Sequence, residues 1–347
     1  MTQLPPIATR RLGQTGLNVS RICLGTMMFA DRTGLPEAKS IADLCLDHGV
    51  YFWDTADMYS RGGSEAMVGE LMAGRRDQIV LATKACRPMS ERPNDRGLSA
   101  RHLIAACEAS LRRLNTDYID IYYLHFTDPQ TRPEETLRAL EDLVRSGKVR
   151  YAGVSNHQAW EVADRVGLAR AHGWQPIDVV QPLYNILNRD IERELIPMAE
   201  HYGMGVVTYS SLARGVLTGK YRAGAAPPEG SRRARGDVRL SQAEWRAESL
   251  ELVEELRPLA EQRDVPLSQL ATAWTLANPL VDSVIIGPRT LAQARDALQS
   301  AALRWDDELE RAIDALSPRG THTGREIPDQ EVFPIRGRPT QYPTFKY

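Results

Sequence analysis

The most constraining feature of this sequence is a rhythm of short apolar runs, each followed by a segment with helical periodicity. Eight such runs occur, at residues 21–26, 50–55, 79–84, 119–125, 149–156, 178–181, 205–210 and 283–287. Most of them are almost continuously apolar, which is typical of strands buried on both faces of a parallel sheet. The rhythm therefore predicts an α/β fold built on parallel strands.

The gaps between these runs carry apolar residues at spacings of three and four, as expected for helices with one buried face. The predicted helices cover residues 36–48, 99–114, 133–145, 157–172, 190–202, 243–262, 267–277 and 290–300. Ser99 is a predicted N-cap. Eight strand-then-helix units fit a closed (β/α)8 TIM barrel. An open doubly wound sheet is the alternative, but no GxGxxG follows the first strand, where such a sheet binds a pyrophosphate.

Three further parts of the chain lie outside this rhythm. Residues 8–20 predict a β-hairpin with Gly13 and Gly16 at its turn, placed as a plug over the bottom of the barrel. Residues 85–98 and 211–242 predict long loops at the C-terminal face. We find no domain boundary and expect one barrel domain over 1–347, ending in a Pro- and aromatic-rich tail at 318–347 that is either disordered or draped over the barrel.

Charge and composition exclude several classes of protein. The 43 Lys and Arg residues balance 45 Asp and Glu residues, so no global positive field would attract a nucleic acid. No apolar run has the 18 or more residues of a membrane span, and the first 20 residues lack the apolar core of a secretory signal. The four cysteines and seven histidines show no metal-binding spacing. We therefore expect a cytoplasmic protein with reduced thiols and a chemistry without metal.

Polar residues end several of the predicted strands, where a barrel of this kind carries its chemistry. Asp54, Lys84 and His125 end three successive strands, and Tyr59 follows Asp54 closely. Taken alone, each has a structural explanation, as a turn cap, a solvated lysine or a buried histidine. Their conjunction at one mouth of the barrel predicts an active site.

The motifs around these residues resemble those of the aldo-keto reductases, over nearly the whole chain. The segment YFWDTADMYSRGGSEAMVGELM resembles the family signature that carries the catalytic Asp and Tyr, LATKA its lysine block, and YIDIYYLH its histidine block. GVSN, QPLYNILNRDIE and YSSLARGVLTGKY resemble its cofactor-binding blocks. The branch that it resembles includes bacterial reductases and potassium channel beta subunits.

The resemblance implies the reversible reduction of an aldehyde or ketone by a nicotinamide cofactor. Hydride arriving at a carbonyl carbon builds negative charge on the oxygen, and Tyr59 is the implied proton donor. A tyrosine has a pKa of about 10, and the cation of Lys84 is expected to lower that pKa. Asp54 is expected to hold Lys84 in a salt bridge, and His125 to donate a hydrogen bond to the carbonyl oxygen. Three other tyrosines are interpreted as packing residues: Tyr118, Tyr122 and Tyr123.

NADPH is the expected cofactor. The residues implied in binding it are Gly25, Thr26, Met27, Asp54, Ser155, Asn156, Gln181, Tyr209, Ser210, Leu212, Gly215, Lys220, Gly287, Arg289, Gln293 and Asp296. The amides of Asn156 and Gln181 suit a carboxamide, and the ring of Tyr209 can cover one face of the nicotinamide. Arg289 favours NADPH over NADH because a guanidinium binds a 2′-phosphate in a bidentate fork.

The expected partner is a small carbonyl or alcohol, but the sequence leaves its identity open among sugar-derived aldehydes, steroid-like or polycyclic ketones and xenobiotic carbonyls. The predicted pocket is lined by Met27, Phe29, Trp53, Arg87 and Phe126. The alternative function is a cofactor-binding regulatory subunit with weak reductase activity, as in potassium channel beta subunits. A metal-dependent hydrolase would need His and carboxylate clusters that the strand ends lack. The oligomeric state is also open.

Overall fold

The centre of the computed structural model, which describes residues 4–222 and 224–324, is a closed barrel of eight parallel strands. The strands are β3 (Ile22–Gly25), β4 (Phe52–Asp54), β5 (Val80–Ala85), β6 (Ile119–Leu124), β7 (Val149–Ser155), β8 (Val179–Gln181), β9 (Gly205–Thr208) and β10 (Ser283–Ile286). All eight coincide with the predicted runs to within two residues at either end. Because β10 pairs with both β9 and β3, the ring closes and the open-sheet alternative is wrong.

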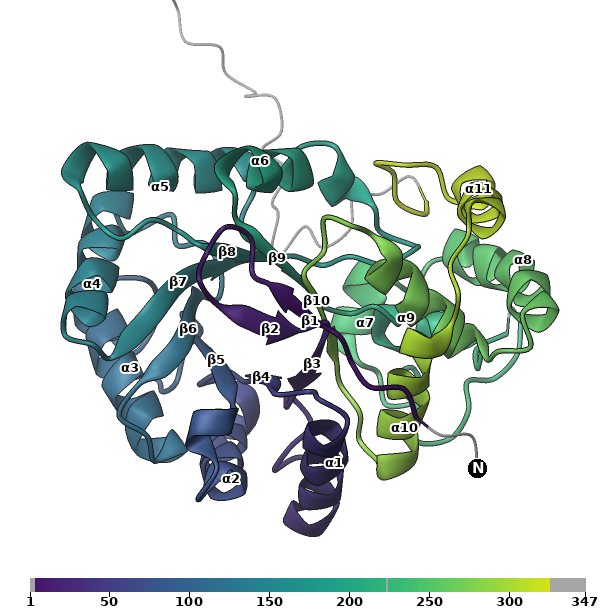
Figure 1. Cartoon of the computed structure of the whole chain (residues 1–347), viewed down its shortest axis with the longest axis horizontal. Helices are drawn as coiled ribbons and strands as arrows, with labels where there is room; N and C mark the ends of the chain where they lie inside the picture. Colours follow the sequence, from purple (N-terminus) through teal and green to yellow (C-terminus); the bar gives the residue numbers. More distant parts are fainter. Residues whose placement is uncertain (1–3, 223, 325–347) are drawn as a thin grey trace, which may run out of the picture.

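Most of the helices form an outer ring around this barrel (Figure 1). The helices of the described residues are α1 (Leu35–Asp47), α2 (Gly63–Met72), α3 (Ala100–Leu114), α4 (Pro133–Arg145), α5 (Ala159–His172), α6 (Leu195–Tyr202), α7 (Val238–Ala243), α8 (Ala247–Gln262), α9 (Leu267–Ala277), α10 (Leu291–Gln299) and α11 (Asp307–Leu316). Ser99 caps α3 as predicted, accepting a hydrogen bond from the N–H of His102. None of the helices in the described residues is long and apolar enough to cross a membrane.

Three helices were not predicted from the sequence: α2, α7 and α11. The buried face of α2 includes Ser64, Glu65 and Gly69, so it lacks the apolar spacing that marks a helix in a sequence. α7 is only six residues long and lies inside the irregular segment 211–242. α11 does carry the pattern, with Leu309 and Ile313 buried, but it follows the eighth unit of the barrel.

The N-terminal hairpin closes the bottom of the barrel, as predicted. It pairs β1 (Thr9–Arg11) with β2 (Asn18–Ser20) and lies across the centre of the ring of strands in Figure 1. Leu12, at its turn, is fully buried beside the interior residues Phe52 and Val207. A Cβ atom at Gly13 would come within 2.4 Å of the backbone nitrogen of Gly205, so only glycine permits this approach.

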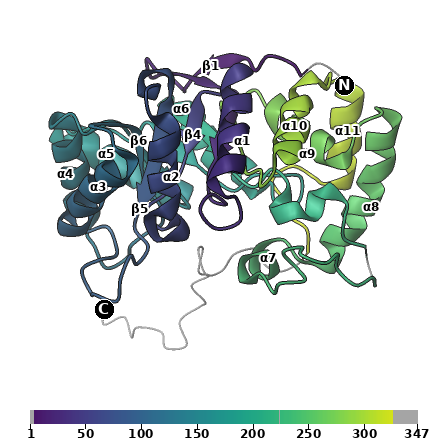
Figure 2. The same ribbon diagram turned by 90° about the horizontal axis from the view of Figure 1, so that it is seen from below.

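The opposite end of the barrel carries the irregular segments. Figure 2 shows the hairpin and α7 at opposite ends of the molecule. The loop after β9 contains a short turn, η4 (Ala213–Thr218), before it reaches α7. Of the predicted C-terminal tail, residues 318–324 are described, and residues 325–347 lie outside the described part. The assignment of the whole chain to one domain stays a prediction.

Alternation along the strands decides which side chains enter the barrel. Cys23, Phe52 and Ala82 lie in the interior cluster, whereas their neighbours Leu24 and Trp53 pack outward against the helices. This is the two-residue periodicity of a strand. Asp54 and Lys84 share the inward side at the C-terminal end of the barrel.

Candidate active site

A buried ion pair stands at the C-terminal end of the barrel. Lys84, on β5, is fully buried, and its Nζ donates hydrogen bonds to Asp54 Oδ1 and, at 2.7 Å, to the carbonyl oxygen of Thr55. The second carboxylate oxygen of Asp54 accepts a hydrogen bond of 2.8 Å from Gln181 Nε2. Burial by itself lowers the pKa of Lys84, but Asp54 and Tyr59 more than offset it, and the pKa lies above its ordinary value. The lysine therefore stays charged at neutral pH.

Tyr59 faces this ion pair from the turn after β4. It begins the short turn η1 (Tyr59–Gly62), and Lys84 Nζ lies 5.2 Å from the centroid of its ring. Loss of solvation raises the pKa of the Tyr59 hydroxyl, whereas the charge of Lys84 lowers it. The pKa is therefore above its ordinary value. The effect expected of Lys84 is present but smaller than the opposing effect of burial.

His125 follows β6 and approaches Tyr59 from the other side. The two ring centroids are 6.0 Å apart, and Phe126 stacks on His125 at 4.6 Å. Burial, followed by the charges of Lys84 and Arg87, holds the pKa of His125 well below its ordinary value. The imidazole is therefore neutral, and its buried Nδ1 has no hydrogen-bond partner within the described residues. A neutral imidazole can donate a hydrogen bond to an oxygen but cannot serve as the acid of the reaction.

Next to His125, the ends of β7, β8 and β9 bring together four of the predicted cofactor residues. Asn156 donates from Nδ2 to the carbonyl oxygen of His125 at 2.9 Å, and its Oδ1 accepts a bond of 2.6 Å from the hydroxyl of Tyr209. Ser155 Oγ donates to the carbonyl oxygen of Gln181 at 2.8 Å. A polar edge of amides beside an aromatic ring fits the carboxamide and the flat ring of a nicotinamide.

Several cations lie close together in the loops at the C-terminal face of the barrel. Burial lowers the pKa of Lys220, and so do the charges of Arg289, Arg232 and Arg235. Loss of solvation, followed by the charges of Arg32 and Arg289, lowers the pKa of Arg235. Cations gathered in this way suit a phosphate group, whose negative charge offsets their repulsion.

Sequence reasoning found Lys220 and Arg289 but missed Arg32, Arg232 and Arg235, which lie in loops without periodicity. Gly215 adjoins this cluster with a φ of 98°. A Cβ atom there would lie 2.8 Å from Lys220 Nζ, so glycine leaves room for the lysine.

The remaining predicted cofactor residues occupy varied positions. Gly25 permits the close packing of β3 on β10, because a Cβ atom would lie 2.6 Å from Ile285. Gln293 accepts the N–H of Arg289 at 2.9 Å, and Asp296 accepts hydrogen bonds from Ser268 and Gln269. Asp296 thus joins α10 to α9. Four others follow strand ends or lie in the following loops without a side-chain contact to the ion pair: Met27, Ser210, Leu212 and Gly287.

Two residues predicted to line the substrate pocket lie in the core outside the ring of strands. Trp53 and Phe29 are fully buried in the cluster between the strands and α1, α2 and α10. Trp53 precedes the inward-facing Asp54 and so points outward, and its indole N–H donates to the carbonyl oxygen of Val50. By contrast, half-buried Phe126 contacts His125, and the guanidinium of half-buried Arg87 lies 4.0 Å from the Phe126 centroid. These two remain pocket candidates.

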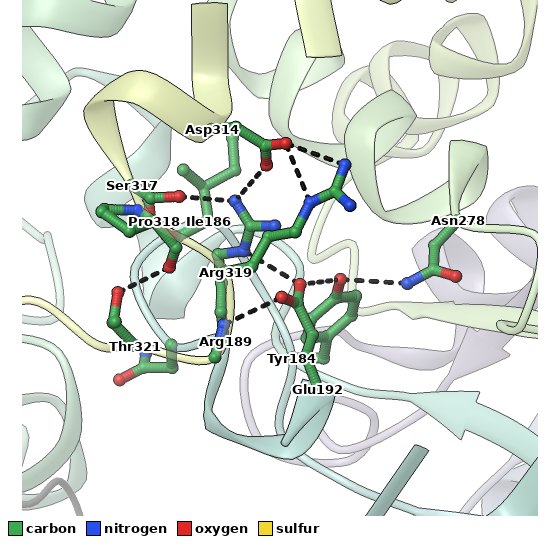
Figure 3. Close-up of polar contacts among 12 residues, drawn as sticks. Tyr184, Ile186, Arg189, Glu192, Asn278, Asp314, Ser317, Pro318, Arg319 and Thr321 are labelled. Atoms are coloured by element: carbon green, nitrogen blue, oxygen red, sulfur yellow. Dashed lines mark hydrogen bonds and ion pairs between the residues drawn. The ribbon is translucent and has the colours of Figure 1, made fainter. Parts of the chain in front are cut away.

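A second buried network braces the loop after β8 (Figure 3). Arg189 is 2% exposed and donates to Glu192 Oε1 at 2.9 Å, to Asp314 Oδ1 at 2.8 Å and to the carbonyl oxygen of Ser317. Glu192 Oε1 also accepts the hydroxyl of Tyr184 at 2.6 Å. Arg189 therefore fastens the end of α11 onto the loop. Of the block QPLYNILNRDIE, only the leading Gln181 reaches the ion pair.

The family is settled by comparison of sequences. The model of the Aldo/keto reductase family matches residues 21–318. The chain belongs to this family. It is 39% identical over 323 residues to YrpG, an uncharacterized oxidoreductase of Bacillus subtilis (strain 168), covering 88% of this chain and 95% of that protein.

Other relatives carry different names. A probable voltage-gated potassium channel subunit beta of Arabidopsis thaliana is 37% identical over 302 residues, covering 84% of this chain and 90% of that protein. A putative aryl-alcohol dehydrogenase of Schizosaccharomyces pombe is 32% identical over 340 residues, covering 89% and 95%. This aldo-keto reductase is thus an oxidoreductase of a family that generally uses nicotinamide cofactors.

Of the three tyrosines interpreted as packing residues, Tyr123 is the one near the ion pair, with Lys84 Nζ 5.9 Å from the centroid of its ring. Tyr122, on β6, is fully buried on the outer side of the barrel, and its hydroxyl donates to the carbonyl oxygen of Leu103. Tyr123 is fully buried in the interior cluster. Tyr118 precedes β6, at the end of the strand opposite His125, beneath the guanidinium of Arg76. Of the four tyrosines considered, Tyr59 alone combines partial exposure with closeness to Lys84.

Proposed function

We propose that this aldo-keto reductase reversibly reduces an aldehyde or ketone to the alcohol, with NADPH as its cofactor. The nicotinamide, when bound, supplies the hydride. The observation that carries the proposal is the convergence of half-buried Tyr59, charged Lys84 and neutral His125 at one mouth of the barrel. A reduction needs these three functions close together: a proton, a charge that stabilises its loss and a donor that orients the carbonyl.

Each residue at the mouth of the barrel has its own role in the proposed reaction. Tyr59 donates its hydroxyl proton to the oxygen on which negative charge develops, and the cation of Lys84 stabilises the phenolate that remains. His125, being neutral, orients the carbonyl oxygen through an N–H bond. Asp54 holds Lys84 in place. In alcohol oxidation the Tyr59 phenolate accepts the proton.

NADPH is proposed over NADH because of the cation cluster. Burial lowers the pKa of Lys220, and Arg289 and its neighbours Arg232 and Arg235 lie close enough to lower it further. A 2′-phosphate would relieve the repulsion among these cations. Asn156 would hold the carboxamide and Tyr209 would cover one face of the nicotinamide ring. The identity of the carbonyl substrate is left to experiment.

A second candidate function is a regulatory subunit, favoured by the similarity to a protein named a probable voltage-gated potassium channel subunit beta. Steady-state turnover of a generic aromatic aldehyde separates the two functions. A reductase turns over repeatedly at substrate saturation. A regulatory subunit would bind the cofactor but show only weak turnover.

The experiment that tests the reductase is Tyr59→Phe. Phenylalanine keeps the ring but lacks the proton, so we expect turnover to fall by about 10²- to 10⁴-fold, the usual contribution of general acid catalysis. The dissociation constant of NADPH, measured by nucleotide fluorescence, should stay within a few fold. Tyr118→Phe, at the other end of the barrel, is the control and should leave both quantities unchanged. Full turnover in Tyr59→Phe, with hydride transfer shown to be rate-limiting by a deuterium isotope effect, would refute the assignment.

A further inference from the structure

The turn that carries Tyr59 has an unfavourable backbone. The three residues that follow Tyr59 all adopt the left-handed conformation: Ser60 with a φ of 49°, Arg61 with 51° and Gly62 with 91°. For a residue other than glycine this conformation is unfavourable, because Cβ comes too close to the following carbonyl oxygen. Such a backbone persists only where the surrounding structure imposes it. The contacts around the turn should therefore identify the residues that place the Tyr59 hydroxyl.

The start of α2, directly after this turn, is fastened to the barrel by hydroxyl groups. Ser64 Oγ lies 2.9 Å from Thr26 Oγ1 and 3.0 Å from Thr55 Oγ1, which follow β3 and β4. Glu65 Oε1 accepts a hydrogen bond of 2.6 Å from Thr83, the neighbour of Lys84 on β5. Ser64 and Glu65 are both fully buried. Residues on or directly after three barrel strands thus hold Ser64 and Glu65, at the start of α2.

Arg113, from α3, completes the attachment. Its Nε donates to Glu65 Oε2 at 2.7 Å, and its Nη2 lies 2.6 Å from the same oxygen. It also packs against the turn itself, because a Cβ atom on Gly62 would lie 2.7 Å from Arg113 Cδ. The arginine therefore contacts both the left-handed turn and the helix start that anchors it. No other described cation forms an ion pair with Glu65 in this structure.

We infer that the ion pair between buried Glu65 and half-buried Arg113 positions Tyr59 for proton transfer, an inference that rests on the proposed role of Tyr59 as proton donor. Among the described residues, neither side chain forms a hydrogen bond or ion pair with Tyr59, so both are positioning residues. Breaking the pair releases the strained turn, and the hydroxyl leaves its place between Lys84 and His125. The loss of activity should consequently depend on that hydroxyl being present.

A double-mutant cycle between Arg113→Met and Tyr59→Phe tests this dependence. With Tyr59 intact, we expect Arg113→Met to slow hydride transfer by about 10- to 100-fold, since a misplacement of about 1 Å can cost 10²-fold. In the Tyr59→Phe background, the same substitution should leave the residual rate unchanged. The dissociation constant of NADPH should be unaltered in both. Single-turnover kinetics with a deuterated cofactor isolates the hydride step.

Two further variants keep the test decisive. Arg76→Met breaks a comparable ion pair, Arg76 to Asp120 at 2.7 Å, near the start of β6, and should change neither rate. Arg113→Met alone leaves the buried carboxylate of Glu65 without a compensating cation. If it does not fold, the double variant Glu65→Gln/Arg113→Met carries the same cycle without a buried charge.

Each outcome is decisive. Loss of rate only when the hydroxyl is present supports the positioning role. An equal loss in both backgrounds, or no loss in either, overturns it while leaving the reductase assignment intact. Full activity of Tyr59→Phe by itself overturns the proton-donor assignment, and the positioning role with it.

Discussion

Removal of Lys84 should separate the contribution of the ion pair at the barrel mouth to stability from its contribution to catalysis. In Lys84→Met, methionine retains much of the length and apolar stem of lysine but has no charge. Asp54, only 3% exposed, then keeps Gln181 as a hydrogen-bond donor but loses the cation that compensates its charge. The variant Asp54→Asn/Lys84→Met removes both charges, and asparagine can still accept the bond from Gln181.

The magnitudes follow from burial. Breaking a buried ion pair by removing one partner typically costs about 3–5 kcal/mol, because the other charge remains uncompensated. Since folded proteins are stable by only about 5–15 kcal/mol, Lys84→Met should lose a large part of its stability. Replacing both partners by neutral groups is often nearly neutral. The double variant should therefore be more stable than Lys84→Met by about 2–4 kcal/mol.

Urea unfolding at neutral pH, followed by tryptophan fluorescence, measures these differences if the slope with denaturant is the same in each variant. A double variant no more stable than Lys84→Met would show that Asp54 is not the source of the penalty. Both variants should be nearly inactive as reductases, since each lacks the cation that stabilises the Tyr59 phenolate.

The pH profile of alcohol oxidation separates the electrostatic effects. Lys84 lowers the pKa of Tyr59 and Asp54 raises it. The ascending limb, along which activity rises with pH as the phenolate forms, should lie at lowest pH in the wild type, higher in the double variant and highest in Lys84→Met. The same ascending limb in wild type and Lys84→Met would refute the claim that Lys84 tunes Tyr59.

Three other predictions address the rest of the molecule. Arg289→Ala should raise the dissociation constant of NADPH by about 10- to 150-fold, from a loss of roughly 1.5–3 kcal/mol, while leaving that of NADH unchanged; equal weakening would show that Arg289 does not contact the 2′-phosphate. Burial raises the pKa of Asp178 to about 6, above the value for the unfolded chain. Between about pH 4 and 6 the folded protein therefore binds one more proton at this carboxyl than the unfolded chain does, and the free energy of unfolding falls as pH rises across that window. Because one oxygen of Asp178 accepts both of its hydrogen bonds, Asp178→Asn should keep them and be about 2–3 kcal/mol more stable than wild type at pH 7 but not at pH 4; a gain independent of pH would contradict this. Arg189→Met should destabilise the protein by roughly 1.5–3 kcal/mol in urea, and much more than Arg263→Met, whose ion pair with Asp306 is more exposed; similar losses would argue against the network as a brace.

Much of the fold was determined by sequence alone. Continuous apolar runs and helical periodicity are local properties, and each of the eight predicted strands forms. Gly13 marked the turn of the plug because a close approach of backbones excludes any side chain. Asp54, Lys84 and His125 could be selected because the ends of successive parallel strands must meet at one mouth of the barrel. Their juxtaposition with Tyr59 follows from that topology.

Only the tertiary structure decided the rest. Because these strands are buried on both faces, their apolar character does not say which side chains point inward, and only the structure shows that Trp53 points outward. The helix α2 buries a serine and a glutamate, so no apolar spacing predicted the helix. The ion pair between Glu65 and Arg113 was not predicted either. Arg32, Arg235 and Arg289 are far apart in the chain, and their mutual repulsion arises only when loops from different units of the barrel meet at one face. Periodicity records what each segment buries, whereas charge clusters depend on which segments become neighbours.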